Sequence, residues 1–223
     1  MPGWQTLYHE LKDKNFEIIS VAQDTGGVKD AGPWIKAANP EFTALVDDKQ
    51  QITMLYNMVN VPTAVWINEQ GKIVRPNEVA YVDNRYTFMH HIEAAPYVAG
   101  IRDWAERGDK SPFVLSDDEV RRRLTPESAD NAMASAEFAL GEYLYANGAG
   151  KDAIPHFKEA QRLNPDSWNY KRQAWALSDS ERDYGTTFMK EVMKLKDKPY
   201  YAPRQLPDAA KSGEVKPDAE KKQ

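Results

Sequence analysis

The stretch 60–74 constrains the fold of this chain more than any other. It opens with Asn-Val-Pro-Thr, continues as the apolar run 64–67, turns at 68–71 and resumes with Ile-Val. β-Branched and aromatic residues on both sides of a turn that contains glycine predict a β-hairpin. Pro62 cannot donate a hydrogen bond to a sheet, so it belongs at the start of the first strand. We expect a cis bond between Val61 and Pro62, with an ordinary trans bond as the alternative.

Composition and charge exclude several kinds of protein. Hydrophobic residues make up 41% and aromatic residues 11% of the 223 residues, enough for a buried core. The net charge of −5 gives no sign of a nucleic-acid partner. No segment approaches the roughly 20 apolar residues of a membrane span, and residues 1–12 do not read as a signal peptide. There is no cysteine, so these residues offer no thiol catalysis, disulfide or thiolate metal site.

Residues 1–95 alternate between helical and strand periodicity, which predicts an α/β arrangement. The segment 16–22 is almost continuously apolar, as in a parallel strand buried on both faces. Asp47 or Asp48 is suited to cap the helix that follows the second strand. We expect helices at 4–11, 28–38, 52–56 and 86–95, and strands at 16–22, 43–46, 63–67 and from 73.

Val61-Pro62-Thr63, the apolar strand and the sequence Ile-Asn-x-x-Gly-Lys-Ile-Val resemble the cis-proline strand and hairpin of the thioredoxin superfamily. The TlpA-like branch of disulfide reductases is the most similar, and residues 1–8 resemble the segment after its Cys-x-x-Cys motif. The resemblance covers about residues 1–107, which we expect to form a thioredoxin-like domain. It implies that Val61, Pro62 and Thr63 bind a substrate peptide, the residue before the proline pairing with it through the main chain.

The chain departs from this family in one respect, because the family's central strand and both cysteines would lie before Met1. Either the natural protein continues upstream with an apolar strand and a Cys-x-x-Cys motif, or it begins here and has lost the redox chemistry. Neighbouring strands lie about 4.8 Å apart, so a missing strand leaves a gap or unpaired edges. We therefore expect strands 16–22 and 63–67 to be splayed or to pair directly. No catalytic residue or cofactor is assigned to these residues.

The second half is helical in pattern. Residues 108–112 form a linker and 116–119 a capping box, and Thr-Pro at 125–126 suggests another helix start. Glu-x-x-Leu-Gly-x-x-Leu at 137–144, Ala-x-x-x-Phe at 153–157 and Pro165 resemble a tetratricopeptide repeat. This implies a helical domain over 108–198 that either docks a peptide or protein, or covers the first domain.

The repeat makes definite structural predictions. Helices at 131–146 and 151–163 should pack antiparallel, with the chain turning at Asn147 and Gly148. Leu140, Leu144, Phe157 and Ala160 should lie between them. Helices at 116–124 and 167–178 should flank this pair, a last helix should span 184–195, and residues 199–223 should form a disordered tail.

Two functional hypotheses follow. The first is a thioredoxin-like protein whose 223 residues lack cysteine and are non-catalytic, and which is a fragment of a redox-active protein. The second is a tetratricopeptide-type interaction module whose first domain is a scaffold. Both imply protein or peptide partners. His90, His91 and Glu93 do not predict a metal site, because adjacent histidines point to different faces of a helix. The TlpA-like branch generally works outside the cytoplasm, but the compartment of this chain stays open.

Overall fold

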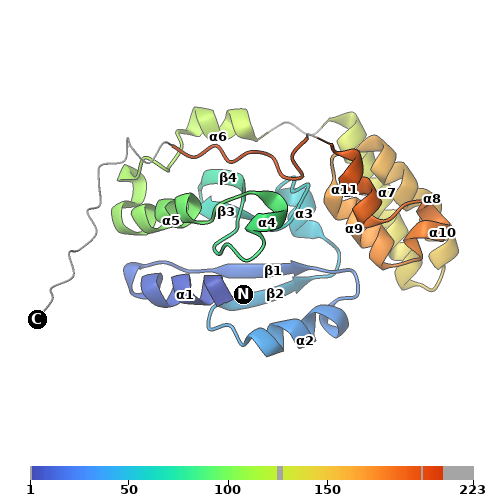
Figure 1. Ribbon diagram of the computed structural model, residues 1–223, viewed down its shortest axis with the longest axis horizontal. Coiled ribbons are helices and arrows are strands. Elements are labelled where there is room, and N and C mark those ends of the chain that lie inside the picture. The colour runs from blue at the N-terminus through green and yellow to red at the C-terminus, as the bar shows by residue number, and fades with distance from the viewer. Residues whose placement is uncertain (1, 125–127, 197, 208–223) are drawn as a thin grey trace, which may run out of the picture.

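A computed structural model describes residues 2–124, 128–196 and 198–207 and shows an α/β part followed by helices (Figure 1). The helix expected from Thr125 and Pro126 lies partly outside the described residues. The elements of the α/β part are α1 (Pro2–Leu11), β1 (Ile19–Gln23), α2 (Val28–Ala38), β2 (Thr43–Asp47), α3 (Gln51–Leu55), β3 (Thr63–Ile67), β4 (Ile73–Val79), α4 (Thr87–His90), α5 (Ala95–Arg107) and α6 (Asp117–Arg123).

In residues 2–124, 128–196 and 198–207 the strands form two separate sheets of two strands each. β1 and β2 pair in parallel, with Ile19 opposite Thr43, and β3 and β4 form the expected antiparallel hairpin. β1 and β3 are therefore not paired with each other; of the two expected alternatives, direct pairing is wrong and separate strands are found. The prediction that the first strand is buried on both faces is wrong, because Ile19 is 64% exposed. Among the described residues β1 has a strand neighbour on one edge only, and its side chains lie outside the main core.

The core of the α/β part lies between α1, the β3–β4 hairpin and α5. Leu7 and Leu11 are one helical turn apart on α1, so both point into this core. Trp66 of β3 stacks on Trp104 with 5.0 Å between ring centroids, and its indole N–H donates to the Tyr97 hydroxyl at 2.9 Å. The β3–β4 hairpin is thus held against α5 by the aromatic side chains of Trp66, Tyr97 and Trp104.

Two of the helices expected from the sequence are divided. The segment 86–95 holds only the short α4, because His91 takes a left-handed conformation (φ 54°) and ends it. Pro96 does not break a helix: it lies in the first turn of α5, where its missing N–H has no partner to lose. The segment 184–195 is likewise not one helix, since Gly185, with φ of 69°, ends α10 and α11 begins three residues later.

The helical part comprises α7 (Ala129–Ala146), α8 (Gly150–Leu163), α9 (Trp168–Ala176), α10 (Ser180–Tyr184) and α11 (Phe188–Lys194). These helices gather at one end of the molecule (Figure 1). We call residues 128–196 the helical unit. The short helix α6 does not flank it as expected; it packs against β4, and Phe113 before it lies in the α/β core.

The α7–α8 hairpin follows the predicted pattern closely. The two helices pack against each other, and the break falls at Asn147 and Gly148. Phe157 is 2% exposed and lies so close to Gly141 that an added Cβ would come within 2.7 Å of its ring. Small residues at this point are therefore needed for the helices to approach. Leu140 is an exception, because it is 42% exposed rather than buried between the helices.

Residues 199–207, expected to begin a disordered tail, instead run from the helical unit back across the α/β part (Figure 1). We call residues 199–206 the strap. Tyr201 is 7% exposed, and Leu206 packs against the α/β core. Residues 208–223 lie outside the described residues. No helix in the described ranges is long and apolar enough to cross a membrane.

Candidate peptide-binding site

The expected site residues lie at the beginning of β3. The Val61–Pro62 bond is cis, as predicted. Pro62 C=O accepts from Ala80 N–H at 3.1 Å, so it points toward β4. Thr63 lies opposite Val79 and Ala64 opposite Glu78. Because hydrogen-bonded and non-bonded pairs alternate along antiparallel strands, the N–H and C=O of Thr63 point away from β4.

This edge of β3 has no strand beside it in the described part of the chain. An unpaired edge offers a row of N–H and C=O groups with which another extended chain can pair. The edge begins next to the cis-proline bond, where Val61 and Thr63 are both partly buried. Two of the three expected site residues, Val61 and Pro62, thus lie directly before this edge, and the third, Thr63, begins it.

The main chain of Val61 is, however, already hydrogen-bonded within the protein. Its N–H donates to the side-chain oxygen of Asn60 at 2.9 Å, and its C=O accepts from the Tyr201 hydroxyl at 3.1 Å. Asn60 also donates from its amide to Tyr200 C=O at 3.2 Å. The strap thus lies on the residue that the family resemblance assigns to the substrate. Nothing in the sequence pattern of residues 199–206 predicted this contact.

The loop before Val61 also holds the helical unit. Val59 C=O accepts from the main-chain N–H of Trp168 at 2.7 Å, and Met58 C=O accepts from the Asn169 side chain at 2.6 Å. These donors lie at the start of α9, where main-chain N–H groups have no partner inside the helix. The Val59 carbonyl, which also accepts from the Asn169 main-chain N–H at 3.2 Å, therefore replaces the missing partners, and the two parts of the chain are joined next to the candidate site.

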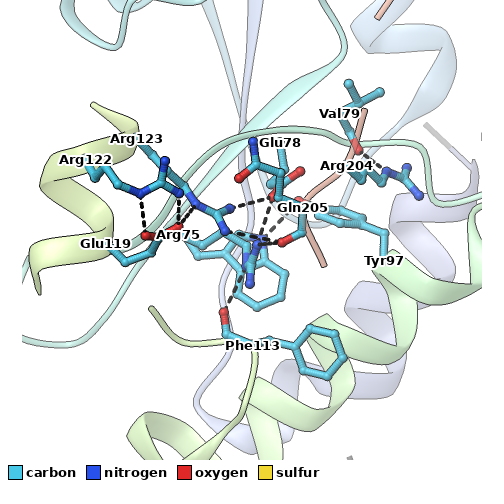
Figure 2. Close-up of polar contacts among 11 residues, drawn as sticks. Arg75, Glu78, Val79, Tyr97, Phe113, Glu119, Arg122, Arg123, Arg204 and Gln205 are labelled. Atoms are coloured by element: carbon cyan, nitrogen blue, oxygen red, sulfur yellow. Dashed lines mark hydrogen bonds and ion pairs between the residues drawn. The ribbon is translucent and has the colours of Figure 1, made fainter. Parts of the chain in front are cut away.

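A buried charge network is built on β4 (Figure 2). Arg75 is completely buried, donates to Glu78 at 2.8 Å and lies over the Trp66 ring at 5.5 Å from its centroid. Burial lowers the pKa of Arg75, and the Glu78 carboxylate opposes that change. The Arg75 guanidinium also donates to Gln205 C=O at 3.2 Å, so the network binds the end of the strap.

A second contact between the two parts involves a buried acid. Glu142 of α7 is 7% exposed and accepts a hydrogen bond from the Thr25 hydroxyl at 2.6 Å. Burial raises the pKa of Glu142 to about 7, and the charges of Asp47 and Asp48 act in the same direction. Asp47 also accepts from the Ile52 N–H in the first turn of α3 at 2.8 Å, but the N-cap position itself is held by Gln50 and not by Asp47 or Asp48.

The candidate site offers hydrogen-bonding groups to a partner. The sequence has no cysteine, and no group of three acidic, histidine or cysteine side chains in the described residues is placed to hold a metal ion. His90 stacks on Tyr81 with 3.9 Å between ring centroids and accepts from Ile92 N–H, so its imidazole serves packing. The remaining functional groups at the site are main-chain donors and acceptors and the strap tyrosines.

Comparison of this chain with protein families, with curated proteins and with solved structures gives no match.

Proposed function

We propose that this chain is a thioredoxin-like protein that binds extended segments of other proteins along β3, and that its 223 residues carry no redox step themselves. The observation that carries the proposal is the unpaired edge of β3, which begins beside the cis Val61–Pro62 bond. Strand addition at such an edge draws its affinity from main-chain hydrogen bonds, so it accepts many sequences. That property suits a protein whose partners are unfolded or extended chains.

Binding to extended peptides tests the proposal. An array of peptides from a reduced and alkylated unfolded protein is probed with the wild-type chain and with Thr63→Pro. Proline removes the N–H that points away from β4, and it is tolerated at the first residue of a strand. Thr63→Ala is the matched control, since it loses the side chain but keeps that N–H. We expect binding by the wild type and Thr63→Ala and its loss in Thr63→Pro, with near-ultraviolet circular dichroism of the tryptophans unchanged in all three.

Equal binding by all three proteins would place the peptide elsewhere and would contradict the proposal.

A redox role is a further part of the proposed function. Thiol–disulfide exchange needs a thiolate, which would have to come from outside these residues. The test is a thiol-reductase assay on a protein extended by any in-frame upstream sequence. If that sequence supplies no cysteine pair, the redox role is rejected and the binding role stands.

A second candidate function rests on the join between the two parts. The main-chain bonds from α9 to Val59 fix the helical unit on the α/β part, as a scaffold would. In that case a tetratricopeptide-type surface on α7 and α8 binds the partner. A photo-reactive residue placed at the exposed Tyr143 would then crosslink to the partner, whereas one placed at Thr63 would not. Crosslinking only from Thr63 favours the first function.

A further inference from the structure

We propose that the strap, residues 199–206, is an autoinhibitory segment that holds the Val61 carbonyl until a competing extended chain displaces it. This inference rests on the proposed binding function and adds its regulation. Tyr201 supplies the inhibitory contact, and Arg204 fixes the position of the strap. The segment is an internal ligand of the site and shows which groups a displacing chain has to replace.

Tyr201 occupies the site with both its ring and its hydroxyl. The hydroxyl lies 3.1 Å from Val61 C=O and 2.8 Å from the Tyr81 hydroxyl. The ring meets the Tyr81 ring edge-on at 5.6 Å between centroids, and the residue is 7% exposed. A strand added beside Val61 would need that carbonyl for its own N–H, so the strap and an incoming chain compete for one acceptor.

Arg204 anchors the strap to the end of the β3–β4 hairpin. Its guanidinium donates to three main-chain carbonyls, those of Val79 at 2.8 Å, Tyr81 at 3.1 Å and Glu93 at 2.6 Å. It also lies 4.9 Å from the centroid of the Tyr97 ring. Three carbonyls that converge on one side chain form a site for a cation, and the strap fills it from within the chain. Figure 2 shows Arg204 beside Val79 and Gln205 beside Arg75.

The contacts between the strap and the α/β part are of a kind that allows the strap to dissociate from Val61. The strap has no strand pairing. Its contacts to the α/β part are hydrogen bonds between a side chain and a main-chain group, the bond between the Tyr201 and Tyr81 hydroxyls, ring contacts and the packing of Leu206. Ala202 and Pro203, between the two anchors, are exposed. A segment near the described end of a chain, held at a few points, opens more readily than a central strand. Release exposes the Val61 carbonyl without any change to the β3–β4 pairing.

The strap is also linked to the helical unit. The Tyr200 ring lies 4.5 Å from the Trp168 ring and 5.9 Å from the Phe188 ring, measured between centroids. Movement of α11 would therefore pull on the residue next to Tyr201. This places the inhibitory contact between the two parts of the protein, where binding at either part can affect it.

The test uses the full chain with Tyr201→Phe and Arg204→Gln combined. Phenylalanine keeps the ring but removes the hydroxyl, and glutamine removes the charge. The control carries Tyr143→Phe and Arg162→Gln, two changes at exposed positions of the helical unit. The probe is a fluorescein-labelled peptide with the sequence of residues 199–207, and a peptide with the same two substitutions serves as the negative probe. Hydrogen exchange of the strap amides reports opening directly.

If the strap leaves Val61 in about a tenth of wild-type molecules, the strap variant should bind the probe about tenfold more tightly than the wild type. Its strap amides should also exchange faster, and the array peptides should bind the variant better by a similar factor. The control should behave as the wild type in all three measurements.

Two other outcomes distinguish the inhibitory role of the strap from the proposed peptide-binding function. Array peptides that bind the wild type and the strap variant equally would overturn the inhibitory role and leave the proposed function intact; the strap would then be a static link between the two parts. An open strap in the variant together with no peptide binding to either protein would overturn the proposed function, and the inhibitory role with it.

Discussion

Replacing Glu142 with glutamine should change how the stability of this protein depends on pH. Glu142 is 7% exposed in α7, and burial moves the pKa of its carboxyl from 4.5 to about 7. The folded protein therefore holds this proton more tightly than the unfolded chain. The contribution of Glu142 to the unfolding free energy is therefore greatest below the unfolded pKa of 4.5. It falls as the pH rises from 4.5 to about 7 and levels off above the folded pKa.

The size of the effect follows from the two pKa values. A change from 4.5 to about 7 corresponds to roughly 3 kcal/mol of unfolding free energy, since each pKa unit is worth about 1.4 kcal/mol. Glutamine cannot ionise, and its oxygen can still accept the hydrogen bond from Thr25. The variant should therefore match the wild type near pH 4 and exceed it by up to this amount at pH 8, less any cost of the added amide N–H groups.

Urea unfolding followed by circular dichroism between pH 4 and pH 8 measures this difference. Subtracting the two stability profiles isolates Glu142, because every other titrating group is common to both proteins. Glu106→Gln, at an exposed position of α5, is the control and should run parallel to the wild type. A constant difference between wild type and Glu142→Gln over this range would refute the reasoning, since it would mean that the pKa of Glu142 is the same in the folded protein as in the unfolded chain.

Four further substitutions test the packing of the helical hairpin and the buried ion pair. Phe157→Ala should lower the unfolding free energy by about 3–5 kcal/mol in urea titrations, because the ring is 2% exposed; a loss below 1 kcal/mol would contradict its place in the core. Gly141→Ala should cost about 1–3 kcal/mol, since the added methyl would lie 2.7 Å from the Phe157 ring. Gly150→Ala, where the nearest side-chain atom is 3.6 Å away, should be neutral or stabilising by the same measurement. Glu78→Ala should lower the thermal midpoint by an amount equivalent to about 3–5 kcal/mol, because the buried guanidinium of Arg75 loses its carboxylate; an unchanged midpoint would mean that Arg75 does not need this partner.

The sequence by itself determined the local elements. The spacing of Leu7 and Leu11 gave a helix, the apolar run after Pro62 and the turn at Gly71 gave the β3–β4 hairpin, and Gly141 with Phe157 gave the helical hairpin. Each of these patterns acts over a few residues or between adjacent elements, so periodicity and turn chemistry are enough to specify it. The position of Val61 and Thr63 at the start of the strand followed from the same local rules.

The tertiary structure alone decided what lies against the candidate site. The contacts of Tyr201 with Val61 and of Arg204 with Val79 join residues more than a hundred positions apart. They involve a carbonyl group that every residue has, so no residue type marks the acceptor in advance. The exposure of Ile19 was likewise not predictable, because an apolar strand is buried only when other elements cover it. Composition placed residues 199–206 in a tail, whereas a few specific side-chain contacts place the strap across the hairpin, since each satisfies a carbonyl or an aromatic face that the α/β part leaves open.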